Sequence, residues 1–167
     1  SNSQKPEVTA GSEILRLTGE PGSHELLASN DSHAVRSLGD IDLVFPLLHG
    51  PFGEDGSLQG MLEMVDVPYV GSGIAASAIG MDKHFMKVVF EAAGFEVGPY
   101  VVIPDKHWER DQASCLKSVE GLQYPLFVKP ARAGSSVGIS RVDTADALPA
   151  AIEAARIHDP KVIVEQG

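Results

Sequence analysis

The sequence has a single cysteine, no long apolar run and few basic residues, and each shortage excludes a class of protein. Cys115 alone cannot form an internal disulfide framework or a zinc site built from cysteines. No apolar run approaches the length that spans a bilayer, and the first residues form no basic-then-apolar signal segment. These features favour a cytoplasmic protein that does not enter a membrane.

The shortage of basic residues limits the possible partners. Lys and Arg number 13 against 23 Asp and Glu, which gives a formal net charge of −10. Nucleic acids and anionic membranes attract positive charge, so neither is expected as the main partner. The charge is uneven, because residues 1–72 hold three basic and eleven acidic residues, whereas residues 73–167 hold ten and twelve. A site for phosphate groups is therefore expected in the second part.

The apolar pattern of the first part predicts an α/β unit. Residues 1–40 are weakly patterned and predict a short strand at 14–17 with loops around it. The continuous apolar run at 41–48 predicts a strand buried on both faces, as in a parallel sheet. A turn-rich loop, an amphipathic helix at 57–65 and a short strand ending near Gly71 complete the unit.

A domain boundary is predicted at the Gly-Ser-Gly segment of residues 71–73. Helix and strand patterns alternate beyond it, with helices expected at 82–93, 107–119 and 144–157, and strands at 99–103, 126–129, 137–142 and 161–165. Gly94 is expected to stop the first of these helices, and Thr144 to cap the last.

A small-residue loop after a buried strand is the strongest local signal. The segment Phe-Val-Lys-Pro-Ala-Arg-Ala-Gly-Ser-Ser-Val-Gly at 127–138 places Lys129 at the end of a strand. Backbone N–H groups in such a loop can converge on an anion, and Lys129 adds positive charge beside them. The spacing is that of neither a Walker loop nor a dinucleotide-binding turn. A plain Gly-Ser hairpin with a surface lysine is the alternative that the segment leaves open.

A lysine at a helix start is the second signal. Asp82 stands where the helix dipole favours a carboxylate, but Lys83 stands in a first turn, where a positive charge is slightly unfavourable. A bound phosphate would explain that lysine. An ordinary solvated side chain would explain it equally well from these residues alone.

The third signal is a histidine and two carboxylates on the loop after residues 41–48. The carboxyl end of a parallel strand is where open α/β sheets bind ligands. His49 and Glu54 could therefore bind an amino acid or tune proton transfers. A metal on the Glu54-Asp55 pair is less favoured, because neighbours in a tight turn seldom point the same way. A structural histidine bonded to backbone is the alternative for His49.

The order and spacing of these motifs closely resemble those of D-alanine–D-alanine ligases. The resemblance lies in Leu-His-Gly-Pro-Phe-Gly-Glu-Asp-Gly-Ser-Leu-Gln-Gly at 48–60, Pro-Tyr-Val-Gly-Ser-Gly at 68–73, Met-Asp-Lys at 81–83, Val-Lys-Pro at 128–130, Gly-Ser-Ser-Val-Gly at 134–138 and Val-Ile-Val-Glu at 162–165. It covers residues 41–167, while residues 1–40 look like the variable insertion of the longer members.

The resemblance implies an α/β ATP-grasp fold, which in this family has three lobes. Residues 1–72 would be the later part of a Rossmann-like N-terminal substrate lobe, with 1–40 variable and loop-rich. Residues 73–167 would be the central ATP-grasp lobe, which carries the phosphate-binding loop. The chain would then lack the start of the first lobe and the whole C-terminal lobe, and by itself it would be inactive.

The implied reaction is ATP-dependent formation of D-alanyl-D-alanine through an acyl phosphate, for peptidoglycan precursor synthesis. By resemblance, four residues bind ATP, namely Lys83, Lys129, Ser136 and Glu165. Three others would act beside the first D-alanine, namely Ser135, His49 and Glu54. Mg²⁺ or Mn²⁺ would assist ATP, with its ligands in the C-terminal lobe and none in this chain. The full-length enzyme would be a cytoplasmic homodimer.

The sequence is also compatible with other activities. A D-alanine–D-lactate or D-alanine–D-serine ligase would carry the same motifs, because the deciding residues of the family lie outside this chain. A non-catalytic ATP-binding fragment would keep Lys83 and Lys129 but not the substrate residues. An NAD-dependent enzyme is disfavoured, since no Gly-x-Gly-x-x-Gly follows any expected strand.

Overall fold

A computed structural model describes residues 13–20, 22–30 and 34–167. Its contacts divide the chain into two compact units. The first unit comprises Ser1–Pro46 and Gln59–Gly71, and the second comprises Leu47–Leu58 and Ser72–Gly167. Within the described ranges, no helix is long and apolar enough to cross a membrane. The lobe boundaries stated above stay a prediction.

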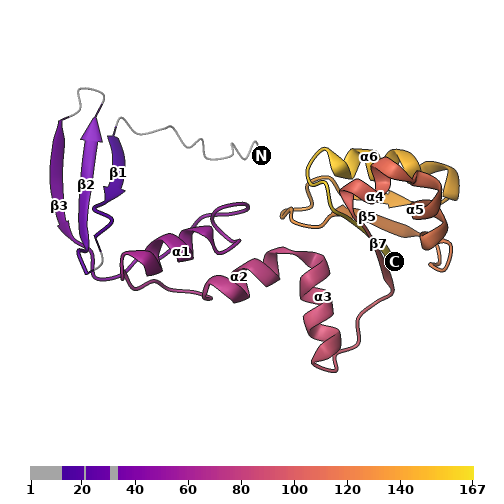
Figure 1. Ribbon diagram of the computed structural model, residues 1–167, viewed down its shortest axis with the longest axis horizontal. Helices are drawn as coiled ribbons and strands as arrows, with labels where there is room; N and C mark the ends of the chain where they lie inside the picture. Colours follow the sequence, from indigo (N-terminus) through magenta and orange to yellow (C-terminus); the bar gives the residue numbers. More distant parts are fainter. Residues whose placement is uncertain (1–12, 21, 31–33) are drawn as a thin grey trace, which may run out of the picture. The chain divides into compact units, whose positions relative to one another are not determined.

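The first unit contains a three-stranded antiparallel sheet (Figure 1). Its strands are β1 (Glu13–Leu17), β2 (Glu25–Asn30) and β3 (Val35–Asp40), in that order across the sheet. Only the first was predicted, and the loop expected around it was wrong at β2 and β3. Every residue of β3 is exposed, so the strand has no buried face and gives no alternating apolar signal. The parts of the loop prediction on residues 1–12, 21 and 31–33 lie outside the described residues.

The strand expected at residues 41–48 was wrong in extent. In the described part of the chain it is reduced to an isolated parallel bridge between Val44 and Tyr69, which also stands in for the expected short strand near Gly71. Phe45 is 64% exposed and Leu47 is 76% exposed, so the apolar run is not buried. Burial on both faces needs a neighbouring strand on each side, and an apolar run does not reveal whether such neighbours are present.

Three helices follow the loop after residue 48. They are α1 (Ser57–Met64), α2 (Ile74–Met81) and α3 (Lys83–Ala92), so the helices expected at 57–65 and 82–93 are confirmed. Asp82 separates α2 from α3 and caps α3, because its carboxylate accepts hydrogen bonds from the backbone N–H groups of His84 and Phe85. Gly94 follows the helix with a φ of +83°, the left-handed conformation expected at a helix end.

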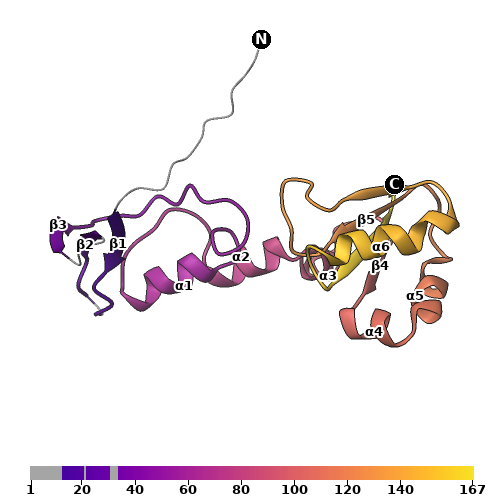
Figure 2. The same ribbon diagram turned by 90° about the horizontal axis from the view of Figure 1, so that it is seen from above.

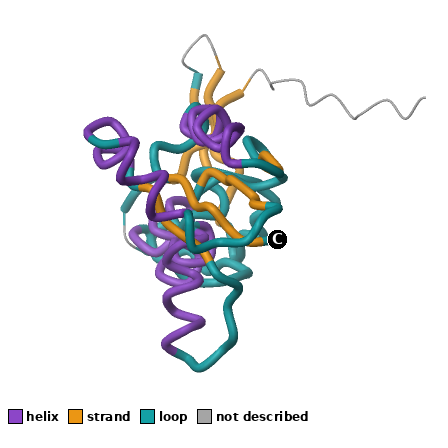
Figure 3. The backbone as a smooth tube through the Cα atoms, turned by 90° about the vertical axis from the view of Figure 1, so that its right-hand side faces the viewer, coloured by secondary structure: helices purple, strands orange, loops and turns teal. Residues whose placement is uncertain are grey.

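The second unit contains a four-stranded antiparallel sheet. Its strands are β4 (Tyr100–Ile103), β5 (Leu126–Pro130), β6 (Ser140–Val142) and β7 (Val162–Gln166), in the order β4-β7-β5-β6. All four had been predicted, although β6 begins three residues later than expected. Figure 3 marks the carboxyl end of the chain directly after β7.

Helices cover one face of this sheet. They are α4 (Asp105–Arg110), α5 (Gln112–Val119) and α6 (Leu148–Arg156), the last entered through the 3₁₀ turn η1 (Ala145–Ala147). Helix α5 contacts β4, while α6 packs against β5, β6 and β7 (Figure 2). The core between helices and sheet contains Ile103, Trp108, Cys115, Val119, Leu126, Val128, Val142, Leu148, Ala151, Ile152, Ala155, Val162 and Val164. This core fixes which face of the sheet is left uncovered by α4, α5 and α6.

Two helix predictions needed correction. The helix expected at 107–119 is broken at Asp111, whose φ of −153° is extended rather than helical. Its carboxylate accepts a hydrogen bond from the N–H of Ser114 and so starts α5. Thr144 precedes η1 but makes no side-chain cap hydrogen bond, so the cap expected there was wrong.

Candidate functional site

The second face of the four-stranded sheet carries the charged residues singled out in the sequence. Side chains alternate along a strand, so Leu126 and Val128 enter the core while Phe127 and Lys129 point the other way. Glu165 lies opposite Phe127 on β5 and opposite Tyr100 on β4. Residues directly opposite in an antiparallel pair share a face. The alternation along β5 and β7 therefore brings a lysine and a glutamate to the face opposite α4, α5 and α6.

Glu165 lies between two ammonium groups. Lys129 donates to its Oε2, and the Nζ of Lys87 in α3 lies 3.1 Å from its Oε1. The side chains of Lys87 and Glu165 are only 13% and 14% exposed. Burial by itself would raise the pKa of Glu165, but hydrogen bonds from Lys129 and Lys87 outweigh it and hold that pKa below its ordinary value. Glu165 is therefore an anion fixed by two cations.

Lys83 meets the same surface from the start of α3. Its Nζ donates to the carbonyl oxygens of Pro130 at 3.2 Å and Ala133 at 2.6 Å, and its N–H donates to the carbonyl of Ala131 at 2.9 Å. Burial lowers the pKa of Lys83, and the positive charge of Lys129 lowers it further, against the attraction of nearby carboxylates. The two lysines that the sequence placed 46 residues apart are thus electrostatic neighbours.

The loop after β5 adopts an unusual backbone. Ser135 and Ser136 have φ values of +50° and +60°, a left-handed conformation that is uncommon for residues other than glycine. Both serines are exposed. Gly138 is also left-handed, and a Cβ there would lie 2.5 Å from the His158 ring, so only glycine fits. Strain of this kind is often kept at ligand sites, where main-chain N–H groups must face a bound group.

The loop that carries His49 is organised by its own carboxylates. The N–H of Gly50 donates to Glu54 Oε2 at 2.5 Å, and those of Phe52 and Ser57 donate to Asp55. The hydrogen bonds to Asp55, first that from the Phe52 N–H and then those from Ser57, hold the pKa of Asp55 below its usual range. Glu54 also approaches the second loop, because a Cβ placed on Gly134 would lie 3.9 Å from its Oε2. Glu54 therefore lies beside the Ser135 loop, as a shared site requires.

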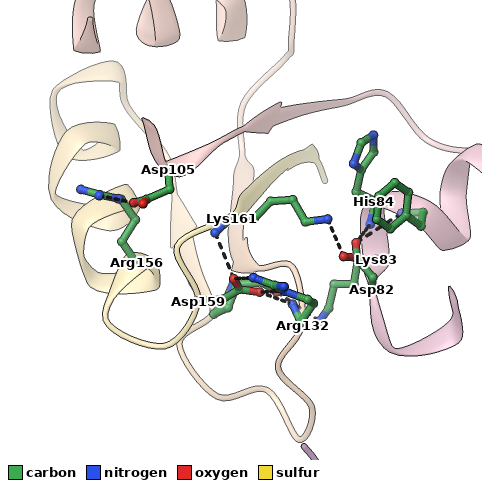
Figure 4. Close-up of polar contacts among 10 residues, drawn as sticks. Asp82, Lys83, His84, Asp105, Arg132, Arg156, Asp159 and Lys161 are labelled. Atoms are coloured by element: carbon green, nitrogen blue, oxygen red, sulfur yellow. Dashed lines mark hydrogen bonds and ion pairs between the residues drawn. The ribbon is translucent and has the colours of Figure 1, made fainter. Parts of the chain in front are cut away.

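A network of ion pairs to buried carboxylates lies next to Lys83 (Figure 4). Asp82 and Asp159 are each 4% exposed. Lys161 pairs with Asp82, while Arg132 donates to Asp159 through its guanidinium at 2.7 and 3.0 Å and through its main-chain N–H at 2.7 Å. The N–H of Lys161 completes the set at Asp159. The network ties the start of α3, the loop after β5 and the turn before β7 to one another.

A cavity of about 540 Å³ lies beside this network, not at the lysines. Its lining includes Asp82, Arg132 and Asp159, together with Asp55 and Ser57 from the His49 loop. Lys83, Lys129 and Glu165 do not line it. The concave space therefore marks where the two loops approach each other, whereas the cation cluster lies on the neighbouring sheet face.

The structure unites part of the predicted site. Lys83, Lys129 and Glu165 meet at the sheet, and Glu54 meets the neighbouring loop. His49, Ser135 and Ser136 are exposed, and within the described ranges no hydrogen bond joins them to the lysines. Their roles stay predictions.

Sequence reasoning missed several charged residues that shape this site. Lys87 carried a readable signal, because it stands four residues after Lys83 and so shares its helix face. The Arg132–Asp159 and Asp82–Lys161 pairs carried none, since their partners are far apart in the chain.

Taken together, the fold and the site define an α/β protein of the ATP-grasp class.

Comparison with known proteins names the family. The family model described as "D-ala D-ala ligase N-terminus" matches residues 2–72, and that described as "D-ala D-ala ligase C-terminus" matches residues 89–167. The chain belongs to the D-alanine–D-alanine ligase family. The predicted family and fold class are both confirmed.

Individual relatives agree with this assignment. A D-alanine–D-alanine ligase of Kocuria rhizophila is 65% identical over 96% of this chain and 43% of its own length, and one of an Arthrobacter species is 54% identical over 100% and 44%. Among solved structures, the VanG D-Ala:D-Ser ligase of Enterococcus faecalis matches with a TM-score of 0.78 at 38% identity, over 92% of this chain and 42% of that one. The chain thus spans less than half the length of these relatives.

Proposed function

We propose that the protein is a D-alanine–D-alanine ligase, which forms D-alanyl-D-alanine at the expense of ATP for peptidoglycan precursor synthesis. The names of the curated relatives support the reaction. One observation in the structure supports the ATP site: Lys83 Nζ donates to the carbonyl of Pro130 at 3.2 Å, directly after Lys129, beside a small-residue loop with left-handed serines. Two neighbouring cations repel each other, so an anion bound between them relieves that repulsion.

In this proposal the chain's own residues hold the nucleotide. Lys83 and Lys129 contact its phosphates, and Ser136 with the N–H groups of its loop covers them. The Glu165 carboxylate accepts a hydrogen bond from the adenine amino group. The N–H dipoles and lysines are directed at oxygens that bear charge during phosphoryl transfer, which is where electrostatic stabilisation lowers a barrier most.

The reaction proceeds in two steps. An oxygen of the first D-alanine carboxylate attacks the γ-phosphorus of ATP, the bond to ADP breaks, and an acyl phosphate forms. The amine of the second D-alanine then attacks the acyl carbon, and inorganic phosphate leaves. Ser135, His49 and Glu54 lie beside the first D-alanine in this scheme, where they orient its carboxylate and keep water away from the acyl phosphate.

The described residues include groups suited to the phosphates of ATP but no group suited to its metal ion. The lysine cluster and the serine loop suit a triphosphate in charge and in donor type. A divalent ion such as Mg²⁺ or Mn²⁺ finds no such match, because residues 13–20, 22–30 and 34–167 contain no group of three or more His, Cys, Asp or Glu that could hold a metal. None of the described residues is therefore assigned to the ion.

The proposal is tested on the complete protein with ATP, Mg²⁺ and D-alanine. We expect phosphate release that depends on D-alanine, and a product with the mass of D-alanyl-D-alanine. Phosphate release without a dipeptide would contradict the ligase reaction. Tight ATP binding with neither product would instead indicate a non-catalytic ATP-binding protein. Sedimentation of the same sample tests the homodimer that we propose, and cell fractionation tests its cytoplasmic location.

A D-alanine–D-serine ligase is the second candidate. The similarity to the VanG D-Ala:D-Ser ligase favours it over other variants, although the curated D-alanine–D-alanine ligases are more similar in sequence. Competition between D-alanine, D-serine and D-lactate at equal concentration separates the candidates by product mass. A mixed product dominated by D-alanyl-D-serine would replace the first proposal by the second.

A further inference from the structure

One carboxylate in the candidate site neutralises two lysines. Glu165 binds Lys129 at Oε2 and Lys87 at Oε1, and these three side chains are between 13% and 23% exposed. A single carboxylate carries one negative charge, so the cluster has an excess of one positive charge before any ligand binds. If a nucleotide phosphate binds one of these lysines, the other can keep its ion pair with Glu165.

Lys129 cannot neutralise Glu165 fully while it also binds a phosphate. Its ammonium lies against Glu165 in this structure and 5.8 Å from the centre of the Phe127 ring. A phosphate bound by this ammonium competes with the carboxylate for its charge and, in this proposal, draws it away. A mostly buried carboxylate left without its cation is strongly destabilising, so that movement needs a second cation at Glu165.

Lys87 is placed to be that second cation. It lies one helical turn after Lys83 on α3, and its Nζ is 5.1 Å from the centre of the Tyr100 ring. Tyr100 is the cross-strand neighbour of Glu165 on β4. The aromatic ring and the helix therefore hold Lys87 at the carboxylate independently of Lys129.

We propose that Lys87 is a positioning residue that keeps Glu165 neutralised and so releases Lys129 to the nucleotide phosphates. The inference rests on the proposed ATP site and assigns to Lys87 no contact with ATP. Without Lys87, Glu165 retains Lys129 and competes with the phosphates for it. The phosphate part of the binding energy falls, while recognition of the adenine by Glu165 persists, because Lys129 still holds that carboxylate in place.

The test compares ATP with adenosine in the complete protein. Titration calorimetry gives the ATP affinity, and ligand-observed NMR gives the adenosine affinity, for the wild type and for Lys87→Met. We expect ATP to bind about tenfold more weakly to the variant, as for one lost charge-assisted contact, with adenosine affinity essentially unchanged. Lys87→Arg, which keeps the charge, restores ATP affinity. Lys117→Met, an exposed lysine on α5, serves as the matched control and binds both ligands as the wild type does.

A double-mutant cycle separates this inference from its rivals. In a Glu165→Gln background no carboxylate competes for Lys129, so we expect Lys87→Met to cost almost nothing there. An equal loss of ATP affinity in both backgrounds would show that Lys87 touches the nucleotide itself and would overturn the inference. Parallel losses for ATP and adenosine would show a general structural role and would overturn it too. If Lys87→Met fails to fold, Lys87→Gln replaces it in the same cycle.

Binding data on the wild type distinguish the role of Lys87 from the ATP site itself. A wild-type protein that binds no ATP contradicts the proposed function itself. A wild type that binds ATP, together with a Lys87→Met variant that binds it equally well, contradicts only the role of Lys87.

Discussion

Individual charged side chains in this chain act through the partners that burial forces on them. Asp159 is 4% exposed and accepts hydrogen bonds from two nitrogens of the Arg132 guanidinium and from the N–H groups of Arg132 and Lys161. Lys83 is held by neutral carbonyls instead, which leaves its charge available. The first arrangement serves stability and the second is suited to binding.

The phosphate role of Lys129 predicts a loss of ATP affinity in Lys129→Ala. One charge-assisted hydrogen bond disappears, so binding should weaken by about 1.5–3 kcal/mol. Titration calorimetry on the complete protein measures this directly. An affinity equal to that of the wild type would remove Lys129 from the proposed site.

The lowered pKa of Asp159 leads us to expect that this residue contributes to folding stability in a pH-dependent way. Burial would raise the pKa of Asp159, but the hydrogen bonds from Arg132 and from the backbone at Lys161 and Arg132 outweigh it, so the folded-state pKa lies below the ordinary 3.8. The unfolded chain therefore binds the proton more tightly. The stabilisation is present above pH 3.8 and disappears as the pH falls through the lower folded pKa.

Asp159→Asn should therefore lose about 1.5–3 kcal/mol of unfolding free energy at neutral pH, and the difference from wild type should shrink in acid. Urea unfolding at several pH values measures it. Asp143→Asn is the control, because Asp143 pairs with Arg141 at the surface and should matter by less than about 0.5 kcal/mol. A difference that stays constant from neutral to acid pH would contradict the assigned cause.

Among the elements, those with a strong local signal were predicted and those that depend on distant partners were not. The strands of the four-stranded sheet and helix α3 follow from apolar patterns and from Asp82 and Gly94 at the helix ends. Strand β3 has no buried face, and residues 41–48 have a strand's composition but only one bridge in the described chain. The break at Asp111 was hidden because Asp111 fits a helical pattern until its capping bond is seen.

In the candidate site, too, residues within a local motif were predicted and pairs between distant segments were not. Its motifs indicated Lys83, Lys129 and Glu165, whose meeting on one surface required the strand register to be known. Lys87 could have been inferred from its four-residue spacing to Lys83. The Arg132–Asp159 pair could not, because it forms only when the turn before β7 closes against the loop after β5.

Helix α3 offers a test of the capping residue. Asp82 both caps the helix and pairs with Lys161. Asp82→Asn keeps a capping oxygen but loses the ion pair, whereas Asp82→Ala loses both, so the alanine variant should be less stable than the asparagine variant by about 1 kcal/mol. Chemical unfolding followed by circular dichroism gives the two values. Equal stabilities would show that the cap contributes nothing beyond the ion pair.

At the scale of the whole molecule, the described residues leave the proposed nucleotide site exposed. His49, Ser135 and Ser136 are exposed, and the chain covers 44% of the length of the Arthrobacter relative. An acyl phosphate formed among exposed side chains would be open to attack by water as well as by the amine. The enclosure of the site is therefore expected to need parts of the family fold outside these 167 residues.

We therefore expect the 167-residue polypeptide, produced by itself, to form no D-alanyl-D-alanine with ATP and D-alanine. The complete protein, assayed beside it under the same conditions, is the control. Dipeptide detected by mass spectrometry with the shorter polypeptide would show that the described residues suffice for the chemistry.

The division of the chain into units has a practical consequence for recombination. The chain passes from one unit to the other after Pro46, after Leu58 and after Gly71. A hybrid gene that exchanges everything from Ser72 onward would move the lysines and the serine loop but leave behind residues 47–58, with His49 and Glu54. Chimaeras between relatives of differing specificity will therefore inherit a complete second unit only when both of its separate coding blocks are transferred together.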